Sequence, residues 1–365
     1  MRQPTVPVTE RTTVMPVTEL PTGADFRLPE YRREVFLRFY EFHLRHRSHP
    51  GGVYYLIPYL RDTLGWTVEE TLWFCFINGC TQHPVTSLTI MRKFPQPTTD
   101  GLAAWFNERW HQLPFDTDRR YQKKDFPAAV SCYLQHAQQG GSQEALFQGG
   151  FTDTWKLVRD KFYSFGRLAS FSYLEYLRTA GMPLDCSTLF FEDLSGSKSH
   201  RNGLAKVLGR DDLDWHKDNT FDGKYAPGQI SWLTDEGAKL LDEARIRFDG
   251  QPFADEVHYF TLESTLCCYK SWYRKNRRYP NVYNDMMHDR IKQVEKLWPG
   301  EDYSIFWDAR RATLPSYLRL EDCPDDPGLC SAKQNHFRNT GQVILMGHEW
   351  PCFTDDGSWR KNNAK

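Results

Sequence analysis

The chain has 365 residues, a length that allows one large or two medium domains. It has 46 basic and 47 acidic side chains, so its net charge alone gives no indication of nucleic-acid binding. Any basic surface must therefore be local. Its nine cysteines include no CxxC pair, and neither zinc-finger spacing nor HExxH occurs, so we expect a reduced, intracellular chain with no metal and no other cofactor. No apolar signal-peptide core and no long apolar run occur, so we expect neither secretion nor a membrane partner.

The N-terminal region is predicted to be an arm followed by two helices. Residues 1–25 repeat Pro, Thr and Val, which predicts an extended and poorly ordered arm. Apolar residues at helical spacing then predict helices over 31–47 and 54–64, separated by the helix-breaking pair Gly51-Gly52. Three histidines near this break are expected at the surface or stacked on bases rather than as metal ligands: His43, His46 and His49.

The most apolar helix of the chain is predicted from Glu70 to Gly79, after a capping signal at Thr67. We expect this helix at the centre of the core. Asn78 and Gln82 lie where it ends, and their amides have two interpretations. They could simply cap the helix, or they could be the donors with which a helical enzyme reads the edge of a base.

Basic and flexible segments follow. Residues 119–124 interleave Arg and Lys with Tyr121, and they predict either a solvated loop or a contact to a phosphate backbone. The Gly- and Gln-rich residues 138–150 predict a flexible connection. A cap at Thr152 predicts a helix to about residue 165, and a further helix is expected over 167–179. These two helices are expected to place four side chains on a common side: Lys156, Arg159, Tyr163 and Arg167.

An anion site is predicted between Asp193 and Asn202, where the sequence is DLSGSKSHRN. Serine hydroxyls, free backbone N–H groups and the basic side chains Lys198, His200 and Arg201 precede a short helix expected from about Asn202. The segment has no Walker A pattern, and an ordinary flexible loop is the alternative.

The helix predicted from Val257 to Asn276 carries two neighbouring stripes. Its apolar stripe consists of Tyr259, Leu262, Leu266, Tyr269 and Tyr273, and its polar stripe of Glu263, Cys267, Lys270, Arg274 and Arg277. Ser264 and Cys268, on the remaining side, are expected to face solvent. Because the polar stripe adjoins the apolar one, we expect it to line a cleft. The alternative is a solvated edge on which Glu263 pairs with Lys270.

The remaining segments complete a mainly α prediction. Helices are expected over 234–248 with a cap at Thr234, and over 285–297 and 303–320, and GQVILMG predicts one short strand. We therefore predict a flexible arm at 1–25, a single two-lobed helical body at 26–320 with lobes of about 26–150 and 151–320, and an irregular extension at 321–365.

Three segments carry a family resemblance: LWFCFINGCTQHPVTSLTIMRKFP, SGSKSHRNGL, and the stretch LE…CCYK…RRYPNVYND. Over roughly residues 28–320 the chain resembles phage alpha-glutamyl/putrescinyl thymine pyrophosphorylases, also called amino acid:DNA transferases. The resemblance implies thymine hypermodification of viral double-stranded DNA in the cytoplasm of an infected bacterium. In that chemistry an amino acid or polyamine displaces pyrophosphate from the 5-methylene of a diphosphorylated 5-hydroxymethyluracil. It also implies a fold similar to helical DNA glycosylases.

The implied reaction gives the singled-out residues their expected roles. The incoming amine must lose a proton, for which Glu263 is the first general base and Asp193 or Asp285 the second. Developing charge on the pyrophosphate would be neutralised by seven basic residues: Lys198, His200, Arg201, Lys270, Arg274, Arg277 and Arg278.

The resemblance also implies binding roles for the remaining residues. Asn78 and Gln82 would read the uracil edge of a base that has left the stack. Tyr163, Phe165 and Tyr279 would receive that base by stacking. Arg167 would hold the carboxylate of an incoming amino acid, and Asp285 would contact the amine.

Two other functions are compatible with the residues. A glycosylase-like base-excision enzyme would use one carboxylate as its catalytic group. A non-catalytic helical module binding DNA or protein would use the basic rows only to neutralise phosphates.

Overall fold

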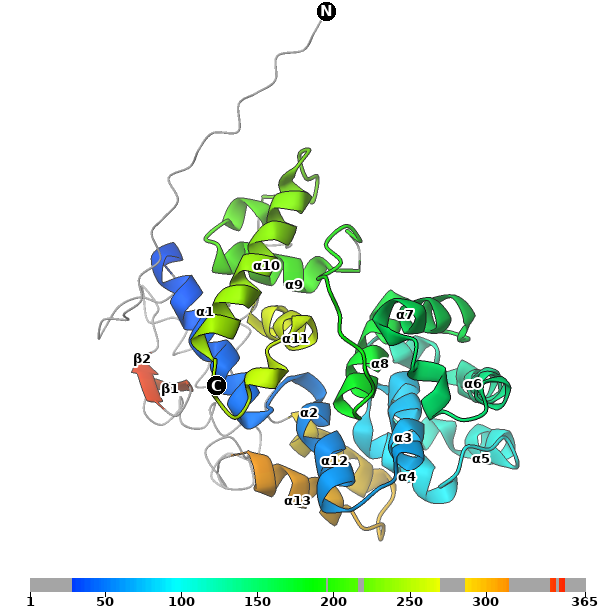
Figure 1. Cartoon of the computed structure of the whole chain (residues 1–365). Helices are drawn as coiled ribbons and strands as arrows, with labels where there is room; N and C mark the ends of the chain where they lie inside the picture. Colours follow the sequence, from blue (N-terminus) through cyan, green and yellow to red (C-terminus); the bar gives the residue numbers. More distant parts are fainter. Residues whose placement is uncertain are drawn as a thin grey trace, which may run out of the picture.

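The computed structural model of the protein describes residues 28–194, 196–215, 220–269 and 286–314, together with the backbone of two strands between 342 and 351. Within these residues the chain is mainly α-helical, as the sequence predicts (Figure 1). The arm at 1–25 lies outside the described residues, as do Lys270, Tyr273, Arg274, Arg277, Arg278, Tyr279 and Asp285. The domain bounds expected from the sequence stay a prediction.

The elements follow one another with short connections. The first helices are α1 (Pro29–His46), α2 (Val53–Pro58), α3 (Val68–Thr81), α4 (Pro84–Lys93), α5 (Leu102–Arg109), α6 (Phe126–Gly140) and α7 (Gly150–Lys161). The later ones are α8 (Arg167–Thr179), α9 (Lys198–Val207), α10 (Gln229–Arg247), α11 (Tyr259–Tyr269), α12 (Met286–Leu297) and α13 (Ser304–Thr313). A π-helical turn at Tyr59–Thr63 extends α2, and β1 (Gln342–Leu345) pairs antiparallel with β2 (His348–Pro351).

One hydrophobic cluster surrounds α3, as its composition predicts. Leu72, Trp73 and Phe76 are fully buried, and α3 packs against α4 and α8. Thr67 caps α3: its side chain accepts from the Glu70 N–H, and the Glu70 carboxylate accepts from the Thr67 N–H. Such a reciprocal cap contributes roughly 1 kcal/mol to the stability of a helix.

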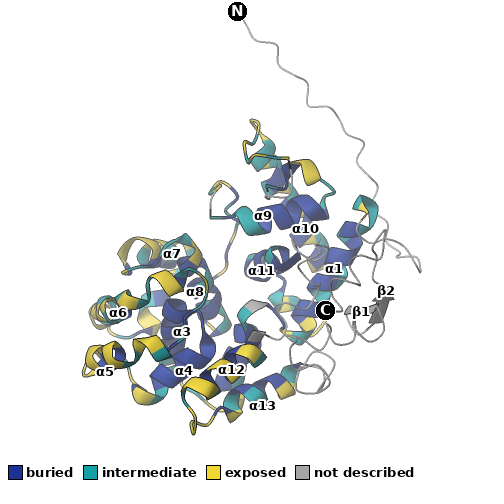
Figure 2. Cartoon of the chain, turned by 180° about the vertical axis from the view of Figure 1, so that it is seen from behind, coloured by how far each residue is buried: buried dark blue, intermediate teal, exposed yellow. Residues whose placement is uncertain are grey.

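A second cluster joins α1 to α9, α10 and α11, which are far apart from α1 in sequence (Figure 1). Helix α11 lies between the two clusters, with Phe260 in the first and Leu262 and Leu266 in the second. Apart from the half-buried Tyr259 and Cys267, its residues are therefore buried (Figure 2). The expectation that Ser264 and Cys268 face solvent is wrong, because the helix has a hydrophobic cluster on each side rather than on one.

Helices α9 and α11 cross at a glycine. A Cβ atom built on Gly203 would lie 2.1 Å from the backbone carbonyl oxygen of Leu266, far inside contact distance. Only the absence of a side chain at residue 203 allows the two backbones to approach this closely. This crossing fixes the distance between the side chains that α9 and α11 direct toward each other.

Several boundaries differ from the predicted ones. Helix α9 begins at Lys198 and α7 at Gly150, both earlier than expected. Helix α10 begins at Gln229, whose side chain accepts from the Ala226 N–H at 2.7 Å. Thr234 is therefore inside the helix, where its hydroxyl donates to the carbonyl of Ile230. A threonine that satisfies the preceding turn has the same sequence pattern as a cap, which explains the error.

Candidate active site

The close crossing of α9 and α11 brings His200 and Glu263 into contact. His200 Nδ1 lies 2.8 Å from Glu263 Oε1, and both side chains are at least nine-tenths buried. The other ring nitrogen, Nε2, lies 2.7 Å from the carbonyl oxygen of Leu189. Because a carbonyl only accepts, Nε2 must carry a proton. One further proton is then shared between Nδ1 and Oε1, as an imidazolium with a carboxylate or as their neutral forms.

A second carboxyl group, on Glu175 of α8, lies next to this pair. Its Oε1 accepts from the Tyr54 hydroxyl at 2.9 Å and from the Ser264 hydroxyl at 2.6 Å. Burial, and next the nearby charge of Glu263, raise the pKa of Glu175 to about 8, although the hydrogen bonds from Ser264 and Tyr54 and the charge of Arg167 act in the opposite direction. Glu175 therefore keeps its proton at neutral pH.

Arg167, the first residue of α8, borders this cluster with unused donors. Its Nη1 donates to the Gly196 carbonyl at 2.9 Å, and its Nε lies 3.6 Å from Asp193 Oδ2. The guanidinium carbon lies 5.2 Å from the centre of the Phe171 ring. Within the described part of the chain, Nε and Nη2 are buried without a hydrogen-bond acceptor. Buried donors without acceptors are costly, so this guanidinium is suited to an anionic ligand.

The 193–197 loop is held by its own hydrogen bonds. Asp193 Oδ1 accepts from the Gly196 N–H at 2.9 Å, and the Asp193 carbonyl accepts from the Ser197 hydroxyl at 2.6 Å. Arg201 is completely buried and donates to this segment's oxygens, including the Leu194 carbonyl at 2.6 Å and the Ser197 hydroxyl at 2.8 Å. In this structure its donors shape the loop. The Lys198 ammonium lies 3.9 Å from the centre of the Trp215 ring.

Asn78 and Gln82 form a separate polar group at the end of α3. Asn78 Oδ1 accepts from the Ser87 hydroxyl at 3.2 Å, and Gln82 Oε1 accepts from the Thr117 hydroxyl. Among the described residues, neither amide nitrogen has an acceptor, although both are buried. These two donors match the carbonyl edge of a pyrimidine in chemistry. Tyr163 is about half exposed, at the end of α7.

Burial corrects two further expectations. Arg119 is not on a solvated loop: its guanidinium donates to the carbonyls of Cys80 and Ser164 at 3.1 and 2.6 Å, and it is almost completely buried. His43 and His49 are likewise buried rather than at the surface. In both regions the polar residues pack under helices that are distant in sequence, which local patterns do not report.

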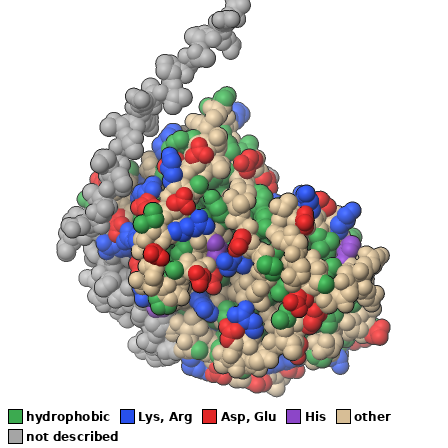
Figure 3. All heavy atoms as spheres, in the orientation of Figure 1, with side chains coloured by type: hydrophobic (Ala, Val, Ile, Leu, Met, Phe, Trp, Pro, Cys, Tyr) green, Lys and Arg blue, Asp and Glu red, His purple; other side chains and the backbone are tan. Residues whose placement is uncertain are grey.

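The sequence interpretation also missed Glu175, Tyr54 and Ser264. Glu175 had a readable signal, since it is an acidic residue inside the apolar run LASFSYLEYL of α8. Tyr54 and Ser264 had none, because only the tertiary fold brings their hydroxyls to Glu175. On the face shown in Figure 3, acidic and basic side chains are intermixed, and no area of one charge dominates.

Two searches of the described residues concern other kinds of site. No three His, Cys, Asp or Glu side chains among them converge where a metal ion could be held. In the same residues, no helix is long and apolar enough to cross a membrane.

Two comparisons with known proteins give matches. The model of the amino acid:DNA transferase family matches residues 53–280, which is more than half of the chain and includes Tyr54, Glu175, His200 and Glu263. The chain is also similar to a protein of Salmonella phage ViI called serinyltransferase, with 26% identity over 356 residues, covering 89% of this chain and 84% of that protein. No solved structure matches. The chain thus belongs to the amino acid:DNA transferase family and is a transferase that modifies DNA with an amino acid.

Proposed function

We propose that the protein replaces the pyrophosphate of 5-pyrophosphoryloxymethyluracil in double-stranded DNA with the amine of an amino acid, in the cytoplasm of an infected bacterium. The observation that carries this proposal is one neighbourhood that holds a proton-sharing carboxylate, Glu263, and an arginine with unused buried donors, Arg167. A base and an anion contact are the two groups that amine attack with loss of an anionic leaving group requires.

The atoms balance in a single displacement. The amine nitrogen forms a bond to the 5-methylene carbon, the carbon–oxygen bond to pyrophosphate breaks, and the electron pair leaves with the pyrophosphate. The nitrogen then carries an extra proton, which Glu263 accepts. Its neighbour Glu175 stays protonated because burial raises its pKa, so it does not compete for the proton.

The leaving pyrophosphate needs positive charge where its negative charge develops. Arg167 offers buried donors, and the adjacent loop offers Lys198 from the first turn of α9. Lys270, Arg274, Arg277 and Arg278 keep their proposed role as further contacts from outside the described residues. His200 and Arg201 act indirectly, because their polar atoms contact Glu263 and the 193–197 loop.

The residues that would recognise the base are proposed from the chemistry of their side chains. A base that has left the stack would be read by the Asn78 and Gln82 amides, whose nitrogens are unsatisfied donors in the described structure. Tyr163 and Tyr279 remain proposed stacking partners. The name of the similar phage protein makes serine the first amino acid to test, with putrescine as the polyamine alternative.

The test uses duplex DNA that carries 5-pyrophosphoryloxymethyluracil, incubated with the protein and with serine, other amino acids or putrescine in turn. Pyrophosphate release coupled to an amino-acid-modified nucleoside, detected by mass spectrometry, is the expected result. Abasic sites would instead indicate base excision. Release of pyrophosphate without amine incorporation, or incorporation into DNA bearing plain 5-hydroxymethyluracil, would contradict the proposed leaving group.

A further inference from the structure

A basic and aromatic surface lies between α5 and α6, on two short 3-10 turns at Thr117–Tyr121 and Lys123–Asp125. Residues 117–125 carry four basic and two acidic side chains, an excess of positive charge in a chain that is nearly neutral overall. Trp110, just after α5, is partly exposed, and Tyr121 is 86% exposed. We call the following five residues the loop surface: Trp110, Arg120, Tyr121, Lys123 and Lys124.

Two lysines of the loop surface have aromatic rings as their neighbours instead of carboxylates. The ammonium groups of Lys123 and Lys124 lie 5.4 and 5.6 Å from the centre of the Trp110 ring, and that of Lys123 also lies 5.3 Å from the centre of the Phe115 ring. Neither ammonium group forms a hydrogen bond or an ion pair with a described residue. Partial burial lowers the pKa of Lys123 to about 8, because the charged form loses hydration. An anion beside these groups would compensate for that loss.

The acidic residues of the two turns face other groups. Asp118 accepts from the Thr117 hydroxyl at 3.1 Å, and Asp125 accepts from the Ser164 hydroxyl at 3.3 Å. Just before the turns, Asp116 is paired with Arg290 of α12. The cations of the loop surface are therefore available to an external partner.

The two turns are tied to the end of α3. The Asp116 N–H donates to the Thr81 carbonyl at 2.9 Å, and the Thr117 hydroxyl donates to Gln82 Oε1. Arg119 donates to the Cys80 carbonyl at 3.1 Å. The exposed cations are thus held next to the Gln82 amide, whose nitrogen is buried without an acceptor among the described residues.

Backbone strain is concentrated at the same place. Gln82, Thr117 and Ser164 have φ values of 49°, 51° and 67°, and they are three of the five non-glycine residues with positive φ in the described part of the chain. This conformation costs free energy for a residue with a side chain, so it persists where surrounding contacts enforce it. Strained residues cluster at ligand-binding sites more than elsewhere.

From the charge, the exposed aromatic rings and the contacts to α3, we infer that the loop surface binds the phosphate backbone of duplex DNA. Lys123, Lys124 and Arg120 contact successive phosphates, and the rings of Trp110 and Tyr121 pack beside them. A duplex presents regularly spaced negative charges, which several cations on one surface can match, whereas a single small anion would occupy only one or two of them.

This surface deepens the proposed function, because a backbone held there brings a neighbouring base close to the Gln82 amide. It rests on the proposed function for the reading of that base, but not for the contact to DNA. Binding of unmodified duplex DNA therefore tests it without any dependence on the leaving group.

The experiment is fluorescence anisotropy of a labelled, unmodified duplex with the full chain at a series of salt concentrations. The slope of log affinity against log salt concentration reports how many phosphates the protein neutralises. The double variant Lys123→Gln, Lys124→Gln should bind at least about tenfold more weakly at about 0.1 M salt, with a slope reduced by about 2. Arg120→Gln should reduce the slope by about 1.

The matched control is the double variant Lys224→Gln, Lys239→Gln, which removes the same charge. Both lysines are exposed and paired with a carboxylate, Lys224 with Asp222 and Lys239 with Glu236. Lys239 is on α10, which lies at the other end of the molecule from α5 and α6 (Figures 1 and 2). The control should keep the affinity and the slope of the unaltered protein.

The assignment is overturned if the unaltered protein does not bind the duplex, if Lys123→Gln, Lys124→Gln leaves affinity and slope unchanged, or if the control lowers both to the same extent. A failed pyrophosphate assay together with the expected loss of slope would reject only the proposed leaving group.

Discussion

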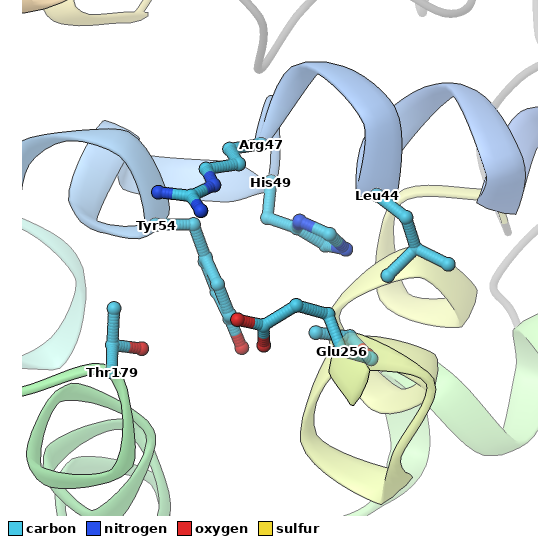
Figure 4. A pocket seen from close by; sticks show the side chains of 7 residues that line it. Leu44, Arg47, His49, Tyr54, Thr179 and Glu256 are labelled. Atoms are coloured by element: carbon cyan, nitrogen blue, oxygen red, sulfur yellow. The ribbon is translucent and has the colours of Figure 1, made fainter. Parts of the chain in front are cut away.

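Two buried histidines show opposite arrangements. His200, at the crossing of α9 and α11, has a partner for each ring nitrogen, with Glu263 at 2.8 Å and the Leu189 carbonyl at 2.7 Å. His49, beneath the α1–α2 turn, has none among the described residues. The first ring has both hydrogen-bond partners from the protein itself, whereas the second has no partner in the part of the chain that the structure describes (Figure 4).

The two rings differ in what they contribute. The fold holds the Glu263–His200 pair in its geometry before any substrate arrives, which is what a group that moves a proton needs. The His49 ring instead keeps both nitrogens without a hydrogen-bond partner among the described residues, at a cost in stability. Variants at the two places should therefore affect activity and stability in different ways.

The largest effect is expected at the Glu263–His200 pair. Glu263→Gln removes the proton acceptor but keeps the shape of the side chain, so turnover should fall by roughly 10²–10⁴-fold, the usual contribution of a positioned base. DNA affinity, measured by fluorescence anisotropy, should stay close to that of the unaltered protein. An active variant would remove Glu263 from the role of base and leave Asp193 and Asp285 as the candidates.

Replacing each histidine by phenylalanine sharpens the comparison, because the two changes should alter stability with opposite signs. His200→Phe leaves Glu263 and the Leu189 carbonyl buried without their partner, and should cost about 2–5 kcal/mol of unfolding free energy. His49→Phe removes unsatisfied polar atoms, and should leave the unfolding free energy unchanged or increase it. Urea denaturation measures both. Recovery of stability in a His200→Phe, Glu263→Leu double variant would show that the lost pairing causes the first effect.

The sequence anticipates these two regions to different extents. The 3/4 spacing of α11 identified Glu263 on a stripe beside the core, and the small-residue loop before α9 brought His200 into consideration. Their contact could not be predicted, since it depends on how closely α9 approaches α11 at Gly203, and no local pattern encodes an interhelical distance. The helices themselves follow from local periodicity, which explains why most of the fold was predicted.

His49 shows the limit of local interpretation. A polar residue just after a helix is ordinarily exposed, and its burial comes from α8 and the segment before α11, which are more than 100 residues away in the chain. Arg167 and Arg201, which contact the same loop, show the same limit. Both are basic and near small residues, yet Arg201 donates to the loop's own oxygens. Two nitrogens of Arg167, in contrast, have no acceptor among the described residues.

Gly203→Ala is designed to disturb only the contact between His200 and Glu263. The added methyl group would collide with the Leu266 carbonyl and push α9 away from α11, which should destabilise the protein by about 1–3 kcal/mol. It should also lower turnover by separating His200 from Glu263. Gly65→Ala is the control, because a Cβ at Gly65 would meet no atom within 4 Å; its positive φ still adds a modest strain that must be subtracted. Unchanged turnover in a folded Gly203→Ala variant would show that the reaction does not need the contact between His200 and Glu263.

A pH-dependent effect is predicted for Glu175, which contacts Tyr54 and Ser264. Its pKa is about 8 in the folded protein against an ordinary value of 4.5, so the folded state binds more protons than the unfolded state between those values. The stability that Glu175 contributes is therefore fully present below about pH 4.5 and is lost as pH rises toward 8, with a slope of at most about 1.4 kcal/mol per pH unit. Urea denaturation from pH 5 to pH 9 should show this decline, and Glu175→Gln should flatten it. In Glu263→Gln the decline should end at a lower pH, because the charge that raises the pKa of Glu175 is gone; an unchanged profile would mean that the two carboxyls do not interact.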